Sequence, residues 1–211
     1  MTTTTDSAIV LKYLNILPYG GRGGVTRFFL LSQGLAFEED LVANWAEEKK
    51  RMIESGENPA GGVPILYISG QARPQHIAAA RYLARVKGLT SGDNYKDYVQ
   101  DLVADEYQGF RDQWAKATFG VDEDAKKDYK DKVVPVQLKK CDSLYESFKT
   151  HHTFLSVSSE TARPLWGDAA IFGLLRDHIL TGYVTREELA VYPRLMAMLT
   201  AYEVIPGWRS G

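Results

Sequence analysis

A proline at the head of a short apolar run is the feature that most constrains how this chain can fold. Pro64 opens residues 65–68, which predict a strand, and a polar corner then leads into an alanine-rich helix over residues 77–86. Because proline has no N–H to give to a sheet, Pro64 must stand where no ladder hydrogen bond is required, which leaves the backbone of Val63 free for another partner. A cis Val63–Pro64 bond would turn that backbone outward as a docking edge for an extended peptide, whereas a trans bond would make an ordinary approach to a strand. The residues themselves leave both alternatives open.

Length and composition allow a globular protein with a sizeable core. The 211 residues suffice for one large domain or two small ones, and the 45% hydrophobic and 25% charged content is ordinary for such a chain. A formal charge of −2 gives no drive toward nucleic acid or an anionic membrane. No apolar run approaches a membrane span, and residues 1–7 lack the features of a signal peptide. A single cysteine, Cys141, excludes an intrachain disulfide, so we expect a soluble protein of a reducing compartment.

The first 88 residues have the pattern of a small α/β layer. Short apolar runs alternate with helix-like segments, as expected of a sheet covered by helices. The predicted strands and helices cover residues 9–17, 25–33, 37–42, 65–68 and 77–86. A further strand could be hidden among them, because boundaries read from one sequence are inexact. We therefore predict that residues 1–88 form an α/β domain.

From residue 94 onward, the chain has the period of helices. Residues 88–93 predict a loop that interrupts the regular structure, and Asp93 is suited to cap the helix that follows. Apolar residues then recur at helical spacing over residues 95–114, 126–148, 166–179 and 192–202. The third of these stretches is apolar nearly all round, which predicts a buried helix. We predict that residues 94–211 form an all-helical second domain.

Residues 20–24, Gly-Gly-Arg-Gly-Gly, do not match a nucleotide-binding motif. A Walker loop would end in Gly-Lys-Ser/Thr, and a dinucleotide fingerprint would need a third glycine where Thr26 stands. The glycines would still let the backbone approach a ligand closely at a helix N-terminus, where an anion is favoured, and Arg22 could donate to it. A flexible strand-to-helix turn is the alternative interpretation.

The chain lacks the residues of a classical hydrolase, a thiol oxidoreductase or a zinc enzyme. His76, His151, His152 and His178 show no metal-ligand spacing, and there is no Gly-x-Ser-x-Gly nucleophile elbow, so we expect no metal. We expect the His151–His152 pair at a solvated helix end and His178 to be a satisfied core histidine. Cys141 lies on an apolar helical stripe, which predicts a packed and inert thiol.

Two tyrosines near the glycines offer a different chemistry. Tyr13 lies in the first predicted strand, and Tyr19 just precedes the glycines. A phenolic O–H beside a helix N-terminus and an arginine can donate to a thiolate, which lowers the pKa of that thiol. The thiol would have to come from a ligand, because the first domain contains no cysteine.

Short segments along nearly the whole chain together resemble one protein family. They are Leu11-Lys-Tyr-Leu-Asn15, Gly21-Arg-Gly23, Trp45 with Lys49, Gly61-Gly-Val-Pro-Ile-Leu66, Gln75 with Ile77-Ala-Ala-Ala-Arg-Tyr-Leu83, Leu165-Trp-Gly-Asp168, Tyr192-Pro-Arg-Leu195 and Ile205-Pro-Gly207. In this order and at these separations, they resemble the cytosolic glutathione transferases, most closely the sigma-like branch that uses a catalytic tyrosine. The resemblance implies a thioredoxin-like N-terminal domain, an all-helical C-terminal domain, usually a homodimer, and glutathione as cosubstrate. It also implies a cytoplasmic detoxification enzyme that transfers glutathione to hydrophobic electrophiles, with isomerase or peroxidase activity alongside.

The resemblance assigns roles to individual residues. Tyr13 would stabilise the glutathione thiolate, and the backbone beside Pro64 would pair with the cysteinyl part as an added strand. Arg22, Trp45 and Lys49 would hold the glycine end. Gln75 would bind the γ-glutamyl end near the N-terminus of the helix that follows, where a carboxylate is favoured. The implied glutathione-binding residues are Tyr13, Arg22, Trp45, Lys49, Gly62, Val63, Pro64, Gln75 and His76.

Two departures from the family pattern concern the glutathione site. About three extra residues, 16–18, separate Tyr13 from Arg22, so Tyr19 could take the catalytic place instead. We prefer Tyr13 because Tyr-x-Asn follows the family pattern. His76 replaces the usual serine; it is larger and titratable, so the affinity for glutathione could be altered or could depend on pH.

Two features of the second domain leave alternatives open. Leu165 stands where a capping serine or threonine is expected, which would cost about 1 kcal/mol unless Asp168 or a backbone group compensates. Tyr107, Phe110 and Trp114 share one helical face and would line the pocket for the hydrophobic substrate, although a stripe with this spacing also suits a core.

The sequence supports two functions of different class. The first is a glutathione transferase. The second is a non-catalytic relative that keeps the fold as a binding or assembly module, because the displaced tyrosine and His76 could mark a vestigial glutathione site.

Overall fold

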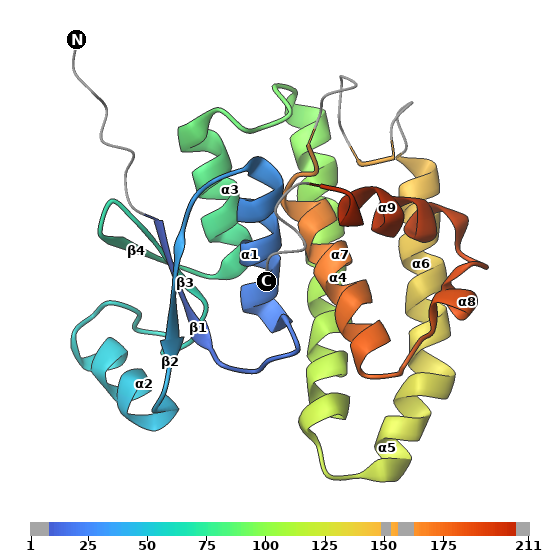
Figure 1. The fold of residues 1–211 in the computed structure, drawn as a ribbon, viewed down its shortest axis with the longest axis horizontal. Coiled ribbons are helices and arrows are strands. Elements are labelled where there is room, and N and C mark those ends of the chain that lie inside the picture. The colour runs from blue at the N-terminus through green and yellow to red at the C-terminus, as the bar shows by residue number, and fades with distance from the viewer. Residues whose placement is uncertain (1–8, 149–152, 156–162, 206–211) are drawn as a thin grey trace.

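The structure, a computed structural model, describes residues 9–148, 153–155 and 163–205 (Figure 1). Its first part is built on a four-stranded mixed sheet with the strand order β2-β1-β3-β4. The strands are β1 (Ile9–Leu14), β2 (Glu38–Val42), β3 (Ile65–Ile68) and β4 (Gln71–Pro74). β1 pairs parallel with β2 and antiparallel with β3, and β4 pairs antiparallel with β3 at the edge. The sheet confirms the predicted α/β layer.

Two helices pack together on one face of this sheet. α1 (Gly21–Gln33) and α3 (His76–Lys87) lie side by side toward the rest of the molecule, while α2 (Trp45–Glu54) lies at the lower end of the sheet in Figure 1. Alternate side chains of the strands point into this layer, so Leu11 and Leu66 are buried there, together with Val25 of α1. The face of the sheet that carries α1 and α3 is therefore the apolar one.

The remaining described chain is helical, as predicted. The helices are α4 (Asn94–Phe119), α5 (Glu123–Asp128), α6 (Val134–Ser147), α7 (Trp166–Leu180), α8 (Arg186–Leu189) and α9 (Pro193–Glu203), with a π-helical segment η1 (Tyr129–Val133) before α6. α7 packs against α4, α9 and α1, and its residues are buried nearly all round, which confirms the prediction of a buried helix. The chain thus has an α/β part followed by a helical part, while the boundaries at residues 88 and 94 stay a prediction.

Aromatic packing joins the two parts. Phe28 of α1 meets Phe172 of α7 edge to face at 5.0 Å, and Phe172 stacks on Tyr202 of α9 at 4.0 Å. Gly173 allows this approach, because a Cβ there would lie 3.2 Å from the Phe28 ring. The Tyr202 hydroxyl donates to the Phe28 carbonyl at 3.0 Å, which satisfies the phenol that this core buries. α1 is therefore held on both sides, by the sheet and by the helical part.

Several element boundaries differ from the prediction. β1 ends at Leu14 rather than at residue 17, because the chain turns there and the Tyr19 N–H bonds to the Ile16 carbonyl at 3.0 Å. α1 begins at Gly21, so the glycines form its first turn instead of a loop before it. The polar corner at residues 71–74 forms β4, and the helices α2 and α8 were not predicted. The long stretch over 126–148 is divided by η1, where Pro135 has no N–H to continue a regular helix.

The start of α7 shows how the missing cap at Leu165 is replaced. The side-chain oxygen of Gln100, from α4, accepts the N–H groups of Gly167 at 2.8 Å and Asp168 at 3.3 Å. Asp168 in turn accepts the Leu165 N–H at 3.2 Å and the Gln100 side-chain N–H at 3.0 Å. Compensation through Asp168 was expected, but the second partner is an amide from another helix rather than a backbone group. At the start of α4, Asp93 caps Tyr95 at 2.8 Å, as predicted.

Candidate functional site

Tyr13 lies where β1 meets the first turn of α1. Only 7% of its surface is exposed, and the Arg22 backbone N–H donates to its hydroxyl oxygen at 3.1 Å. Within the part of the chain that the structure describes, no group accepts the O–H of Tyr13 itself. Its proton is therefore available to another acceptor.

The glycines make room for the tyrosine ring. A Cβ on Gly21 would lie 2.5 Å from the Tyr13 hydroxyl, and a Cβ on Gly23 would overlap the ring, at 2.8 Å from Cδ2 and closer to two other ring atoms. Gly21 also has a φ of +56°, in the left-handed region that favours glycine. A close backbone approach was predicted here, and what the backbone approaches is the Tyr13 phenol.

Burial keeps this phenol protonated at neutral pH. It raises the pKa of Tyr13 above its ordinary value of 10.0, and it outweighs the backbone N–H groups of Gly23 and Arg22 and the Arg111 and Arg22 charges, which lower the pKa. A protonated phenol is a hydrogen-bond donor, and such a bond is strongest when the acceptor is an anion. The geometry therefore suits the stabilisation of a negative atom placed beside the hydroxyl.

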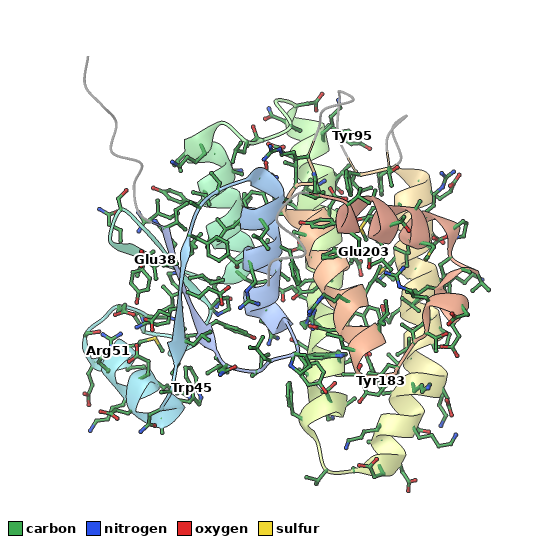
Figure 2. All side chains as sticks on the ribbon, viewed as in Figure 1. Glu38, Trp45, Arg51, Tyr95, Tyr183 and Glu203 are labelled. Atoms are coloured by element: carbon green, nitrogen blue, oxygen red, sulfur yellow. The ribbon has the colours of Figure 1, made fainter. Side chains whose placement is uncertain are left out.

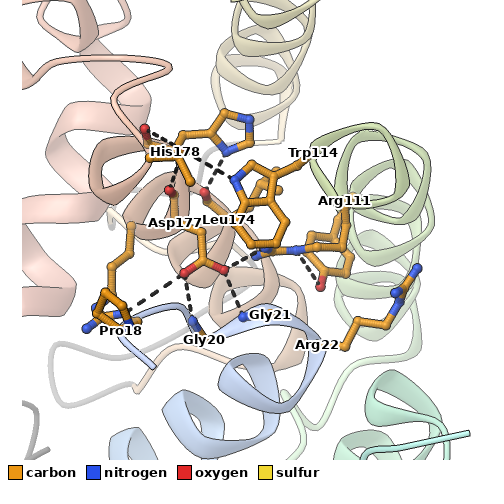
Figure 3. A network of polar contacts seen from close by, with 12 residues as sticks. Pro18, Gly20, Gly21, Arg22, Arg111, Trp114, Leu174, Asp177 and His178 are labelled. Atoms are coloured by element: carbon orange, nitrogen blue, oxygen red, sulfur yellow. Dashed lines mark hydrogen bonds and ion pairs between the residues drawn. The ribbon is translucent and has the colours of Figure 1, made fainter. Parts of the chain in front are cut away.

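A buried carboxylate from the helical part holds the same turn of α1. Asp177 of α7 accepts the backbone N–H groups of Gly20 and Gly21, each at 2.8 Å (Figure 3). It also pairs with the Arg111 guanidinium at 2.6 Å, and both side chains are almost completely buried. Sequence reasoning missed these two residues. The available signal was a charged residue inside a predicted buried helix.

The three residues expected at the glycine end of glutathione differ in their surroundings. The Arg22 guanidinium pairs with Asp112 of α4. Lys49 is exposed on α2 and reaches the loop before Pro64, because a Cβ on Gly61 would lie 3.3 Å from its Cε. Trp45 is half-buried at the start of α2, at the lower end of the sheet in Figure 2. The structure thus brings Lys49 to the proline loop and draws Arg22 toward the helical part.

The loop before β3 presents free backbone. The Val63–Pro64 bond is cis, which decides between the alternatives that the residues left open. Among the described residues, no backbone group bonds to the N–H or C=O of Val63. The Gly62 carbonyl accepts the side-chain N–H of buried Asn58 at 2.6 Å, and Asn58 also accepts the Ala60 N–H at 3.1 Å. Asn58 was not predicted, although an Asn-Pro pair is a turn signal.

The first residues of α3 separate into an exposed and a buried side chain. Gln75 is exposed with a φ of +71°, a conformation that is costly for a residue with a side chain. No side chain caps α3 in the described chain, so its first N–H groups have no side-chain acceptor there. His76 is 2% exposed, and its ring lies 5.7 Å from that of Tyr107. Burial and the Arg22 and Arg111 charges lower the pKa of His76 to about 3, so this side chain stays neutral and does not supply the pH dependence that we considered.

The aromatic residues near the site are mostly core. Tyr107, Phe110 and Trp114 are each at most 1% exposed, so the structure places them in the interior between α4 and α7 rather than on an open pocket wall. Helical spacing cannot distinguish these two environments, because both need one apolar face. Tyr19 turns away from the α1 turn, and its ring meets Trp114 at 5.8 Å and Phe119 at 6.3 Å.

Other candidate groups have structural surroundings. His178 is a satisfied core histidine, as predicted: its Nδ1 donates to the Leu174 carbonyl at 2.7 Å, so its Nε2 accepts the Tyr129 O–H at 2.6 Å. Burial raises the pKa of the Cys141 thiol to about 12, which confirms a packed and inert cysteine. His151 and His152 lie outside the described residues.

The described residues contain no cluster of three or more histidine, cysteine or acidic side chains that could hold a metal. None of their helices has the length and apolar character that crossing a membrane requires.

Comparisons with known proteins point to one family. No protein-family model matches the chain. In sequence it is 28% identical to hematopoietic prostaglandin D synthase from Gallus gallus over 201 residues, which cover 93% of this chain and 90% of that protein. It is 27% identical to glutathione S-transferase S1 from Drosophila melanogaster over 157 residues, which cover 71% of this chain and 59% of that protein. This chain is a homologue of the cytosolic glutathione S-transferases.

Solved structures of glutathione S-transferases have the same fold. A Pi-class enzyme from Onchocerca volvulus superposes with a TM-score of 0.79 at 20% identity, covering 95% of this chain and 89% of that one. A Caenorhabditis elegans enzyme gives a TM-score of 0.75 at 24% identity, with 96% and 94% covered. These likenesses confirm the predicted fold, a thioredoxin-like N-terminal domain followed by a helical domain.

Proposed function

We propose that this homologue is an enzyme that transfers glutathione to hydrophobic electrophiles. One observation carries the proposal: the Tyr13 phenol is buried and protonated, its oxygen accepts the Arg22 N–H at 3.1 Å, and its own proton is free to be donated. A hydrogen bond from this phenol to the sulfur of glutathione would stabilise the thiolate. Hydrogen bonds to charged groups contribute about 1.5–3 kcal/mol, which corresponds to about one to two units in the pKa of the thiol.

The proposed reaction keeps the tyrosine proton in place. The thiol of glutathione loses its proton to solvent, and the sulfur attacks an electrophilic carbon. A carbon–sulfur bond forms while the leaving group departs with its bonding electrons, and Tyr13 remains a donor throughout. The rate enhancement would come from thiolate formation and from the positioning of the two reactants.

The free backbone around Tyr13 supports the binding mode. The unpaired Val63 backbone would bond to the cysteinyl part of glutathione as an added strand, with Gly62 and Pro64 shaping the edge. The uncapped start of α3, at Gln75 and His76, would take the γ-glutamyl carboxylate. The cations and the indole expected at the glycine end are Arg22, Lys49 and Trp45.

The electrophile needs an exposed apolar surface. Leu17 and Phe119 are 69% and 57% exposed, and Tyr19, two residues after Leu17 in the chain, packs on Phe119. We therefore place the electrophile against Leu17 and Phe119 in this proposal, and not against the buried Tyr107, Phe110 and Trp114. No metal takes part.

The proposal includes a cytoplasmic homodimer with a role in detoxification. Large apolar side chains are exposed on α3 and the start of α4, where Figure 2 labels Tyr95. They are Tyr82, Val86, Tyr95 and Tyr98, which are 39%, 53%, 63% and 54% exposed. Aromatic side chains gathered on neighbouring helices suit a contact with a second copy. Sedimentation velocity would show the mass of two chains, and a single-chain mass at micromolar concentration would contradict the dimer.

A pair of tyrosine variants tests the catalytic assignment. Purified protein should bind to immobilised glutathione and conjugate a chloronitrobenzene. Tyr13→Phe removes the donor but keeps the ring, so the rate at neutral pH should fall about 10–100-fold, the equivalent of one hydrogen bond to a charged group. Tyr19→Phe is the matched control, because its ring contacts are kept and its hydroxyl has no partner among the described residues. Unchanged activity in both variants would refute the tyrosine mechanism, and a loss only in Tyr19→Phe would move the role to Tyr19.

The ion pair between Arg22 and Asp112 favours a second candidate function. It occupies a guanidinium that would otherwise face the glycine end of glutathione. In this alternative, the chain is a non-catalytic binding or assembly module with a weakened glutathione site. Wild-type protein without measurable conjugation of any electrophile tested, at saturating glutathione, would favour it.

A further inference from the structure

The first turn of α1 depends on a group from the other half of the molecule. Its N-cap is Gly20, which has no side chain to accept a hydrogen bond, and its first turn contains no acidic residue. The carboxylate of Asp177 takes this place across 157 and 156 positions of sequence, by accepting the N–H groups of Gly20 and Gly21 at 2.8 Å (Figure 3). A carboxylate at a helix N-terminus is also favoured by the helix dipole.

The same turn is in direct contact with Tyr13. Gly21 donates its N–H to Asp177, and a Cβ on its other side would lie 2.5 Å from the Tyr13 hydroxyl. The next N–H, of Arg22, is the one that donates to that hydroxyl at 3.1 Å. Gly21 is therefore held between the carboxylate and the phenol. A displacement of this turn would change the Arg22–Tyr13 hydrogen bond as well as the room left for the ring.

A buried cation fixes the carboxylate. Arg111 of α4 pairs with Asp177 at 2.6 Å and donates through Nε to the Tyr107 hydroxyl at 3.2 Å. Its remaining nitrogen, Nη2, is buried and has no partner among the described residues. Because a buried guanidinium needs a counterion, Arg111 and Asp177 each set the place of the other. Asp177 cannot turn away from α1 without leaving this charge unpaired.

We propose that Asp177 is a positioning residue for the thiol chemistry, which acts through Gly20 and Gly21 on the hydroxyl of Tyr13. The proposal rests on the function proposed above for Tyr13. Asp177 touches neither glutathione nor the electrophile in this account. Asp177 keeps the Arg22 N–H within hydrogen-bond distance of the Tyr13 oxygen. The O–H of Tyr13 then points at the sulfur while its oxygen accepts the Arg22 N–H.

The test compares one substitution at two buried aspartates of the same helix. Asp177→Asn keeps the size of the side chain but replaces one acceptor oxygen with an NH₂ that faces N–H donors. Asp168→Asn is the control, because Asp168 is equally buried in α7, and its hydrogen bonds come from Gln100, Tyr145 and the backbone of Leu155 and Leu165 rather than from α1. Both variants should lose stability. Only the first should alter the ionisation of the bound thiol.

The readout is the pH profile of kcat/KM for the electrophile at saturating glutathione, together with the ultraviolet absorbance of the bound thiolate. Asp177→Asn should raise the thiol pKa by about one unit, so that its rate is about tenfold low at pH 6.5 and recovers toward the wild-type rate at pH 9. Asp168→Asn should leave the thiol pKa at the wild-type value. If Asp177→Asn does not fold, the double variant Asp177→Asn/Arg111→Gln, which removes the unpaired charge, should show the same shift.

The outcomes separate this inference from the proposed function. Wild-type protein that does not lower the pKa of the bound thiol overturns both. A wild-type protein that lowers it, with Asp177→Asn or the double variant unchanged, overturns the positioning role alone. An equal shift in Asp168→Asn also overturns it, because general loosening of α7 would then explain the effect.

Discussion

Gly23→Ala is the substitution for which sequence and structure predict opposite results. Gly23 is the third residue of α1, and alanine is favoured over glycine inside a helix by about 1 kcal/mol. Sequence reasoning would therefore predict a more stable protein. In the structure, a Cβ at this position overlaps the Tyr13 ring, at 2.8 Å from Cδ2 and closer to two other ring atoms.

The size of the effect follows from this overlap. Non-bonded carbon atoms pack best at about 3.5–4.0 Å, so the ring would have to move by more than about 1 Å. Overpacking a buried site costs about 1–3 kcal/mol, and the gain in helix propensity offsets about 1 kcal/mol of that. We expect a net loss of up to about 2 kcal/mol in the free energy of unfolding. A shift of about 1 Å in a catalytic group can lower a rate about 100-fold, so conjugation should fall much more than stability suggests.

Urea denaturation and conjugation kinetics measure these two effects. Gly109→Ala is the matched control, because Gly109 is exposed inside α4 and a Cβ there would meet nothing within 4 Å. It should gain up to about 1 kcal/mol and keep its activity. In a double-mutant cycle, Tyr13→Ala should remove most of the cost of Gly23→Ala, because the ring is then absent. A Gly23→Ala protein as stable and as active as Gly109→Ala would refute the packing on which the site is built.

Two further predictions concern stability. Burial lowers the pKa of His76 from 6.5 to about 3, so below pH 6.5 the unfolded state binds a proton that the folded state does not, and stability is lost as the pH falls. Between pH 7 and pH 5 this loss amounts to about 2 kcal/mol in the free energy of unfolding. His76→Leu sacrifices no hydrogen bond in the described structure, so urea denaturation at the two pH values should show a loss about 2 kcal/mol smaller than that of the wild-type protein. An equal loss in the two proteins would contradict a neutral buried ring. Gln100→Ala removes the acceptor that caps α7 and should lower the free energy of unfolding by about 2–3 kcal/mol. Asn44→Ala, at the exposed cap of α2, should lower it by about 1 kcal/mol or less. Similar losses in the two variants would show that the buried amide is not the cap.

The parts of the fold that could be predicted are those with a local pattern. The apolar run before Ser69 gave β3, and helical spacing gave α4, α7 and α9 within a few residues of their observed ends. β4 was missed because its four residues, Gln-Ala-Arg-Pro, include no β-branched or aromatic side chain, and the strand forms by pairing with β3. The first turn of α1 was missed because glycines disfavour a helix, and here contacts with Tyr13 and Asp177 override that preference.

The residues of the candidate site also differ in whether a local sequence pattern identifies them. Tyr13, Val63 and Pro64 could be singled out because their neighbours in sequence carry the signal. Asp177 and Arg111 could not, because the contacts that bring them to the site, from Asp177 to Gly20 and from Arg111 to Asp177, join residues 157 and 66 positions apart in the chain. The spacing of Tyr107, Phe110 and Trp114 suits a core and a pocket equally well. Only the packing of α4 on α7 shows that these side chains are buried.

The proposed mechanism depends on the order of two acidities. A cysteinyl thiol has an ordinary pKa of about 8.5, whereas the Tyr13 phenol starts at 10.0 and is raised further by burial. Donors from the α1 backbone lower the pKa of the phenol, but not enough to reverse that order. The thiol is therefore the group that ionises first, and the phenol is still a donor when the thiolate forms. Stronger donation to the phenol oxygen would strengthen the hydrogen bond to sulfur only until the phenol itself ionised, after which two anions would face each other. Burial beneath α1 and polarisation by its N–H groups thus have opposite effects on Tyr13, and the chemistry requires both.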